Sequence, residues 1–259
     1  IRLADEKPSK TELENPFGRY KNDEKLSKPH RDEAYNLPYT YTDNYQNHIS
    51  GLVPIAEVKP LCKERGITIG EFLATGIILA IIRTAEKTIE KTIVIDVPVN
   101  VRNFFPSDTV RNFTSSIPLQ FNPEGRMDWT FDEIAAKIKG QLAQVNSRET
   151  QQGFINSNYA LTQNKVLQVI PYFIKKPVLN MMQKKSHTKE MTIIMSNIGN
   201  FTLPPVMSNN IERIEVVSGD SRVYGMPMFF YIISMNGYMN IIFGLSGKDR
   251  TLCTEYFRI

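Results

Sequence analysis

The segment Ile93–Phe121 constrains the fold of this chain more than any other part of the sequence. It opens on a run of isoleucines and valines that ends at Pro98. A nearly unbroken apolar run of this kind is typical of a strand that is covered on both faces. Thr114–Phe121 has the composition of a second strand. Pro118 lies within it and predicts an edge or irregular position, because proline cannot donate a hydrogen bond to a neighbouring strand.

The loop between these two strands is polar, basic and aromatic. From Asn100 to Asn112 it carries two arginines, three asparagines and two phenylalanines. Binding residues concentrate on loops that a rigid scaffold holds in place, so this loop is a candidate wall of a functional site. A solvated connection between two core strands is the alternative, and the sequence leaves both open.

Two helices are predicted over residues 68–87 and 130–146. Each opens on a Thr-x-x-Glu capping box, in which two side chains satisfy free N–H groups at the start of a helix. The first helix is apolar on nearly all sides and is therefore expected in the core. The second has apolar residues at three- and four-residue spacing, which indicates an amphipathic helix.

A third helical region is predicted over residues 158–185. Pro171 and Pro177 are expected to kink or split it, because proline interrupts helical hydrogen bonding. We expect its many apolar residues to lie in the core. No run of 18 apolar residues is present, since Ile67–Ile82 is interrupted by polar residues and glycines and reads as a buried helix.

The last third of the chain predicts further strands. A short buried strand is expected at 191–195, followed by a loop at 196–205 and another strand at 211–217. Asn236-Gly237 separates two apolar runs and is a strong signal for a two-residue hairpin turn. A terminal helix is expected from Arg250. The mixture of helices and strands predicts an α/β sandwich with a mixed sheet.

The first 47 residues differ from the rest. They are polar and charged, carry several prolines and show no sustained periodicity, which predicts a linker or a strap over another surface. The globular part is then expected to span residues 48–259. Because the chain begins with isoleucine and ends as a helix starts, we expect it to be a piece of a longer protein.

Composition narrows the function classes. The net charge of +4 is too small, and the basic residues too scattered, to favour nucleic-acid binding. Cys62 and Cys253 are far apart and belong to no metal or redox motif, so free thiols in a reducing cytoplasm are expected. No phosphate-binding glycine loop, nucleophile elbow or metal-ligand cluster is present.

Several motifs resemble the bacterial alcohol-acetyltransferase-like proteins of the chloramphenicol acetyltransferase and condensation-domain superfamily. The resemblance covers most of the chain but only the C-terminal half of such a protein. It implies a chloramphenicol-acetyltransferase-like two-layer sandwich lobe with a mixed sheet. It is carried by Val97–Arg102, Phe104–Ser107, Arg111–Phe113, Thr68–Ala74 and Ser196–Gly199.

The resemblance also implies roles for five residues. Arg102 matches the arginine that pairs with the aspartate of the superfamily's His-x-x-x-Asp motif, a role that suits the fixed fork of a guanidinium. Asn112 and Phe113 match a turn that faces the substrate tunnel. Ser196 and Asn197 match a position that offers a donor to the reacting carbonyl. A packed Phe113 and an Asx turn from Asn197 to Gly199 are the structural alternatives.

The catalytic base itself is not in this chain. None of its three histidines has an aspartate four residues later, and His48 is interpreted as a structural or interface histidine. The resemblance therefore implies an acyltransferase completed by an N-terminal lobe of the same protein. It implies acetyl-CoA or another acyl-CoA as cosubstrate, an alcohol or amine as acceptor, and no permanently bound cofactor. A non-catalytic binding module and a condensation-type domain for carrier-bound acyl groups are the alternatives.

Overall fold

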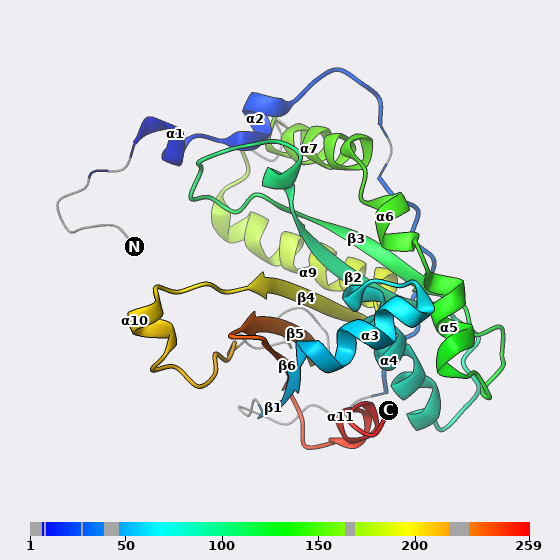
Figure 1. Cartoon of the computed structure of the whole chain (residues 1–259). Coiled ribbons are helices and arrows are strands. Elements are labelled where there is room, and N and C mark those ends of the chain that lie inside the picture. The colour runs from blue at the N-terminus through cyan, green and yellow to red at the C-terminus, as the bar shows by residue number, and fades with distance from the viewer. Residues whose placement is uncertain (1–6, 8, 27, 39–46, 164–168, 218–227) are drawn as a thin grey trace.

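The chain folds around one six-stranded sheet (Figure 1). The computed structural model describes residues 7, 9–26, 28–38, 47–163, 169–217 and 228–259. The strand order is β1-β6-β5-β4-β2-β3. β4 pairs in parallel with β2 and β5, and the other three pairings are antiparallel. The predicted mixed sheet is confirmed. The strands are β1 (Asn47–Pro54), β2 (Ile93–Asn100), β3 (Thr114–Phe121), β4 (Ile193–Asn200), β5 (Met228–Met235) and β6 (Tyr238–Leu245).

Helices on one face of the sheet enclose the main core. Alternate residues of every strand from β2 to β6 pack with α3, α4, α5 and α11. The middle of α4 is inaccessible to solvent, as its apolar sequence predicts. Both capping boxes form as predicted. The helices are α3 (Ile55–Arg65), α4 (Ile69–Thr84), α5 (Phe131–Ile138) and α11 (Thr251–Tyr256).

The helix predicted over 130–146 is in fact two helices. α5 ends at Ile138, and α6 (Gln141–Val145) follows a break at Gly140, where φ is +77°. The Gly140 N–H donates to Glu71 Oε1 at 2.7 Å, and the other carboxylate oxygen caps α4. The prediction of one helix was wrong, because an acceptor 69 residues away satisfies the N–H at the break.

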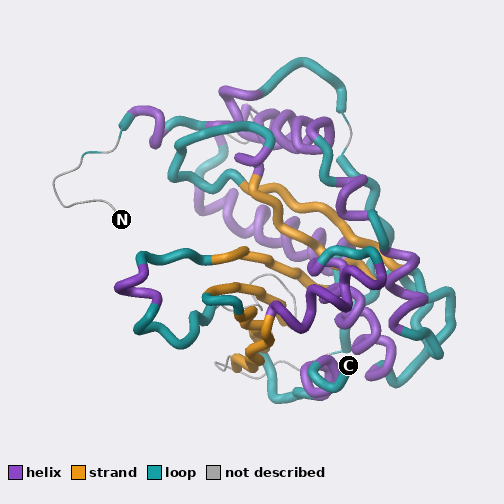
Figure 2. Tube along the Cα trace, viewed as in Figure 1, coloured by secondary structure: helices purple, strands orange, loops and turns teal. Residues whose placement is uncertain are grey.

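The third helical region also differs from the prediction. α7 (Arg148–Gln163) begins ten residues earlier than expected. α9 (Tyr172–Glu190; Figure 2) begins directly after Pro171, as a break there predicts, but it runs through Pro177. The expectation that the apolar residues here lie in the core was wrong for most of those described, since Ile170 is half-buried and the others are exposed. Leu167 and the side chains of Val178 and Met182 lie outside the described residues. The exposed apolar residues are Val169, Tyr172, Phe173, Ile174, Leu179 and Met181.

Two strand boundaries near the end of the chain were also mispredicted. β4 continues to Asn200, so the first half of the loop expected over 196–205 is strand. Residues 211–217 are not a strand; they lie along the sheet, where Asn240 Nδ2 donates to the carbonyl of Ile214 at 2.8 Å. The hairpin at Asn236-Gly237 is confirmed, with φ of +51° and +80° at its two turn residues. The short helix α10 (Pro205–Ser208) precedes this segment.

The described part of the N-terminal segment lies on this lobe. We call residues 9–26 and 28–35 the strap. It contains α1 (Lys10–Leu13) and α2 (Pro16–Tyr20), and α2 packs on α7. Ala34 is fully buried, and its N–H donates to the carbonyl of Lys189 at 2.9 Å. The strap is therefore anchored on the lobe at both ends of its described length, although the sequence predicted a linker or a strap over another surface.

In the described part of the chain, no single helix is long and apolar enough to cross a membrane. α3 and α4 meet that test only as a pair bent by 87°.

Replacing Gly140 tests why the helix breaks there. Gly140→Ala should lower the free energy of unfolding by about 1–2 kcal/mol, because an alanine at positive φ is strained although space is open around it. The control is Gly70→Ala, whose new Cβ would meet Leu142 at an ordinary 3.7 Å. Urea unfolding should show a loss for the first variant and none for the second; equal stabilities would contradict the assignment.

Candidate functional site at the fork of the sheet

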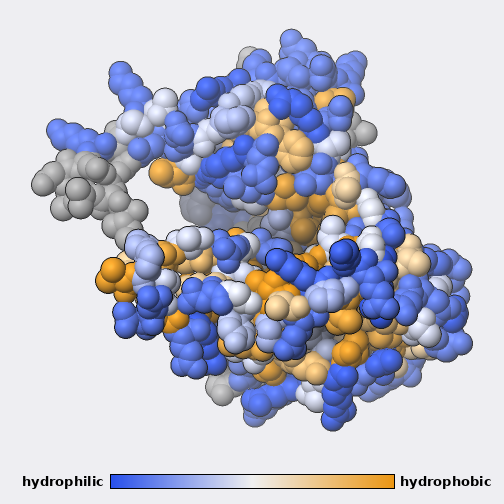
Figure 3. Space-filling view, in the orientation of Figure 1, coloured by the Kyte–Doolittle hydropathy of each residue, from blue (hydrophilic) through white to orange (hydrophobic). Residues whose placement is uncertain are grey.

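The sheet splits between β2 and β4. The two strands share only two residue pairs, Ile95 with Ile193 and Asp96 with Ile194, whereas β4 stays paired with β5 as far as Asn200. Their carboxyl ends separate, and the surface is deeply hollowed between the part that carries α2 and α7 and the part that carries β4 and α10 (Figure 1 and Figure 3). We call this split the fork, with a β2–β3 arm and a β4–β5 arm.

Proline contributes to the split. Asp96 is the last residue of β2 that pairs with β4. Pro98 lies two positions later and has no N–H to donate to β4. On its other side β2 remains paired with β3 to Asn100. Pro118 lies in β3, which is an edge strand of the sheet, as the sequence predicted.

Arg102 lies at the base of the loop on the β2–β3 arm. Its Nη2 donates to the carbonyls of Thr109 and Arg111 at 2.7 and 2.8 Å, and its Nη1 donates to Asn100 Oδ1 at 3.3 Å. These bonds use three of the five N–H groups of a guanidinium. Arg102 follows β2 in the one-turn 3-10 helix η1 (Val101–Asn103). In this structure Arg102 therefore braces its own loop, and its pairing with an aspartate of another lobe stays a prediction.

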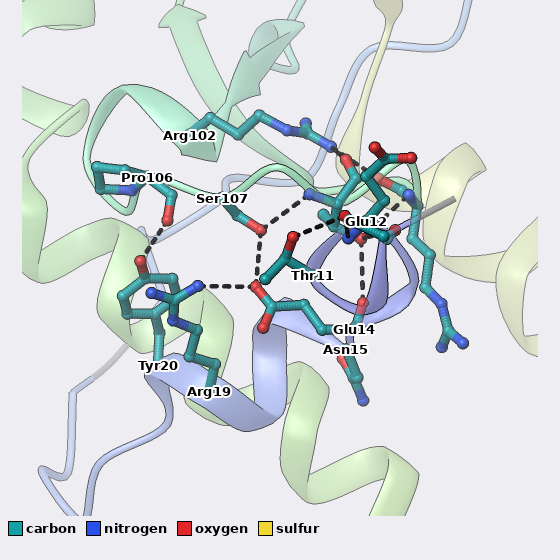
Figure 4. Close-up of polar contacts among 12 residues, drawn as sticks. Thr11, Glu12, Glu14, Asn15, Arg19, Tyr20, Arg102, Pro106 and Ser107 are labelled. Carbon is teal, nitrogen blue, oxygen red and sulfur yellow. Dashed lines mark hydrogen bonds and ion pairs between the residues drawn. The ribbon is translucent and has the colours of Figure 1, made fainter. Parts of the chain in front are cut away.

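The strap shapes the loop that Arg102 holds. Thr109 Oγ1 donates to the carbonyl of Glu14 at 3.0 Å, and Val110 N–H donates to that of Glu12 at 2.9 Å. The Glu14 carboxylate accepts from Ser107 Oγ at 3.2 Å and from Arg19 at 2.9 Å (Figure 4). The bond to Glu14 raises the pKa of the Arg19 guanidinium. The position of Arg102 thus depends on residues that lie about 90 positions earlier in the chain.

A second apolar cluster joins strap, loop and α7. Phe113 is fully buried, and Phe17 meets it edge-on with ring centroids 5.2 Å apart. The Tyr20 ring stacks near it, and the Tyr20 hydroxyl donates to the carbonyl of Pro106. Packing is therefore the observed role of Phe113, and its place in a tunnel wall stays a prediction. The cluster consists of Val101, Phe105, Phe113 and Ile155, with Phe17, Tyr20 and Phe104 against it.

The other three predicted residues are accessible. Asn112 is exposed beside Phe113 and accepts a hydrogen bond from the Thr114 hydroxyl. Ser196 and Asn197 lie on the β4–β5 arm and point to opposite faces of the sheet, since side chains alternate along a strand. Asn197 Oδ1 accepts from the N–H of Gly199 at 2.9 Å, which is the Asx turn considered as the alternative. The five predicted residues therefore divide between the two arms of the fork.

The described cysteines, histidines and carboxylates do not form a nucleophilic or metal site. Cys253 is buried, and burial raises the pKa of its thiol to about 12, so it is not a thiolate near neutral pH. Burial also raises the pKa of Cys62. The described residues contain no group of three or more potential metal ligands. His30 is largely exposed beside Asp32, and the side chain of His187 lies outside the described residues.

One charged pair was missed by sequence reasoning. Asp96 lies within the apolar run of β2 with only 6% of its side chain exposed, and Arg31 of the strap reaches it with Nη2 2.6 Å from Oδ1. Arg31 Nη2 also donates to Ser116 Oγ at 3.0 Å. The signal was present, because a carboxylate in a strand covered on both faces must be paired.

Known proteins resemble this chain in structure but not in sequence. No family model matches the chain, and no curated protein matches it by sequence. Among solved structures, the trichothecene 15-O-acetyltransferase of Fusarium sporotrichioides aligns over 93% of this chain and 48% of its own, with 11% identity and a TM-score of 0.56. Polyketide synthase associated protein 5 of Mycobacterium tuberculosis aligns over 86% and 54%, with 12% identity and a TM-score of 0.52.

A third similar structure comes from a peptide synthetase. The epimerization domain of the third module of tyrocidine synthetase B aligns over 96% of this chain and 55% of its own, with 14% identity and a TM-score of 0.51. The chain thus spans about half the length of the solved structures it matches. The chain therefore shares the fold of a half-domain of these structures, an α/β lobe with a mixed six-stranded sheet, as predicted from the sequence.

Removing the ring of Phe17 tests the dependence of the loop on the strap. Phe17→Ala should cost the strap contact about 1–2 kcal/mol, somewhat less than a fully buried aromatic side chain, because Phe17 is partly buried. Amide hydrogen exchange should then speed up across residues 104–113 and remain unchanged in α4. Leu13→Ala is the control, because Leu13 is 51% exposed. Unchanged exchange in the loop would show that the strap does not hold it.

Proposed function

We propose that this chain is the C-terminal lobe of an acyltransferase that moves an acyl group, with acetyl from acetyl-CoA as the expected case, onto an alcohol or amine. The observation that supports it best is the fold match, which covers nearly all of this chain and about half of each matched structure. One of these structures is named as an O-acetyltransferase. A second lobe would then supply the catalytic histidine and close the site over the fork.

The exposed apolar residues support a partner lobe. Apolar side chains gather at the end of the β4–β5 arm and in α10, where Val206 is 82% exposed (Figure 3). Exposed apolar patches of this kind mark surfaces that another protein surface covers. The residues at this end are Ile198, Phe201, Val206 and Met207.

In the proposed enzyme Arg102 is a positioning residue. Two of its five N–H groups are not used by its own loop, and one of these on Nη1 can donate to a carboxylate of the second lobe. An arginine in this position would hold the histidine-bearing segment still while the histidine takes the proton of the acceptor. Asn112 from the β2–β3 arm and either Ser196 or Asn197 from the β4–β5 arm, which point to opposite faces of the sheet, would face the space between the arms. Two free, buried thiols agree with a proposed cytoplasmic location.

A condensation-type domain for carrier-bound groups is the second candidate. The match to an epimerization domain of a peptide synthetase favours it. The two candidates differ in the acyl donor. The complete protein should turn over acetyl-CoA in the first case, whereas in the second only an acyl group attached to a carrier protein should react. A complete protein that binds but transfers neither would favour the third possibility, a binding module.

Arg102→Ala should lower kcat of the complete protein about 10- to 100-fold, which corresponds to the loss of one hydrogen bond to a charged group. KM for the acyl donor should stay nearly constant, because Arg102 would act through the histidine segment. Steady-state kinetics with the preferred donor provide the measurement.

Arg258→Ala is the matched control, because Arg258 is exposed and lies in the last turn, away from the fork. The isolated 259-residue chain should show no turnover. Normal turnover by the chain alone, or equal losses in the two variants, would remove the two-lobe proposal.

A further inference from the structure

A cavity of about 540 Å³ lies between the strap, the β2–β3 arm, α7 and the end of α9. Its volume is in the range of small-molecule sites. None of the five residues predicted for the fork lines it. It combines polar groups with apolar surface from Pro29, Ile117, Phe154 and Met191. The polar lining residues are Lys28, His30, Arg31, Asp96, Ser115, Ser116, Thr150, Gln151 and Glu190.

The buried pair of Arg31 and Asp96 is incompletely bonded. Asp96 Oδ1 lies 2.6 Å from Arg31 Nη2 in the ion pair, although not in the alignment of a hydrogen bond, and Arg31 is the only partner that the described residues give this carboxylate. Arg31 Nη1 likewise has no hydrogen-bond partner within the described ranges. An ionised carboxylate can accept about four hydrogen bonds, and buried polar groups are rarely left without them. Asp96 therefore presents unused acceptor capacity at a cavity wall.

The other polar groups differ from Asp96, because several of them are already satisfied within the chain. Ser115 Oγ is bonded to Gln151 Oε1, and Gln151 Nε2 donates to Asn146 Oδ1 at 3.1 Å. Ser116 Oγ accepts from Arg31. A ligand that completes the site must therefore bring a hydrogen-bond donor to Asp96.

The charges of the lining residues favour a ligand whose hydrogen-bond donor is neutral. Besides His30, the wall carries two cationic side chains, Lys28 and Arg31, and two anionic ones, Asp96 and Glu190. Arg31 already neutralises Asp96, and Glu190 is exposed to solvent, so an ammonium group would gain only a weak, screened attraction for the hydration it loses. A hydroxyl can donate to the carboxylate at a smaller cost of desolvation.

We infer that this cavity binds an alcohol, a small amphipathic molecule whose hydroxyl donates to Asp96 and whose apolar part packs against Phe154 and Met191. The site shares the β2–β3 arm with the fork but none of the five residues predicted there, and its occupancy does not depend on acyl transfer. Binding alone tests it.

A matched set of probes tests the inference on the unmodified chain. 2-Phenylethanol, its methyl ether and 2-phenylethylamine share one aromatic body and differ in the group offered to Asp96. The methyl resonance of Met191, assigned with Met191→Leu, reports directly on the cavity. The alcohol should shift it saturably. The ether, which cannot donate, should bind about 10- to 100-fold more weakly, as expected for a lost hydrogen bond to a charged group.

Asp96→Asn provides the second measurement, with Asp128→Asn as the matched control, because the side chain of Asp128 is 82% exposed. The first substitution should weaken alcohol binding about 10-fold or more and the control should leave it unchanged. If Asp96→Asn does not fold, the probe series on the unmodified chain decides. No shift of Met191 with the alcohol, equal binding of the ether, or tighter binding of the amine would each overturn the inference.

Discussion

The two residue pairs that join β2 to β4 are the constraint on which the rest of this lobe depends. They make one sheet of two halves, yet they are too few to keep the strands together beyond Asp96. A strand that continues without a partner exposes polar backbone groups. In this chain β2 remains hydrogen-bonded to β3 beyond Asp96, and β4 remains hydrogen-bonded to β5. The arms can therefore diverge, and side chains from two distant segments can border one hollow.

The strap is part of this arrangement. It supplies the cation for Asp96, two aromatic rings of the apolar cluster around Phe113, and the acceptors that fix the loop of Arg102. Leaving one member of a buried ion pair without its partner costs about 3–5 kcal/mol. A lobe without the strap would carry that cost at Asp96 and would also expose Phe113. The described part of the N-terminal segment thus contributes to the stability of this lobe.

Local signals predicted the elements whose ends are set by nearby residues. The capping boxes of α4 and α5 and the turn at Asn236-Gly237 involve partners within a few positions, so they could be found in the sequence. The break at Gly140 could not, because its acceptor is Glu71. The end of β4 at Asn200 depends on its pairing with β5. The exposure of α9 depends on whether another part of the fold packs on its apolar residues.

The same distinction applies to the candidate site. Arg102 was recognised from a motif, but the bonds that Thr109 and Arg111 make to it depend on the strap. Asp96 could have been suspected from its charge in an apolar strand, whereas nothing nearby points to Arg31 as its partner. Side chains that act through distant segments were therefore the ones that the sequence did not reveal.

We propose that the fork is one half of a site and that another lobe closes it. Amide hydrogen exchange of this chain, alone and combined with a histidine-bearing N-terminal lobe of the parent protein, tests it directly. If another lobe closes the fork, the amides of residues 100–113 on one arm and 196–207 on the other should gain protection from exchange, and those of α11 should not. Protection confined to α3 and α11, or no protection at either arm, would contradict it.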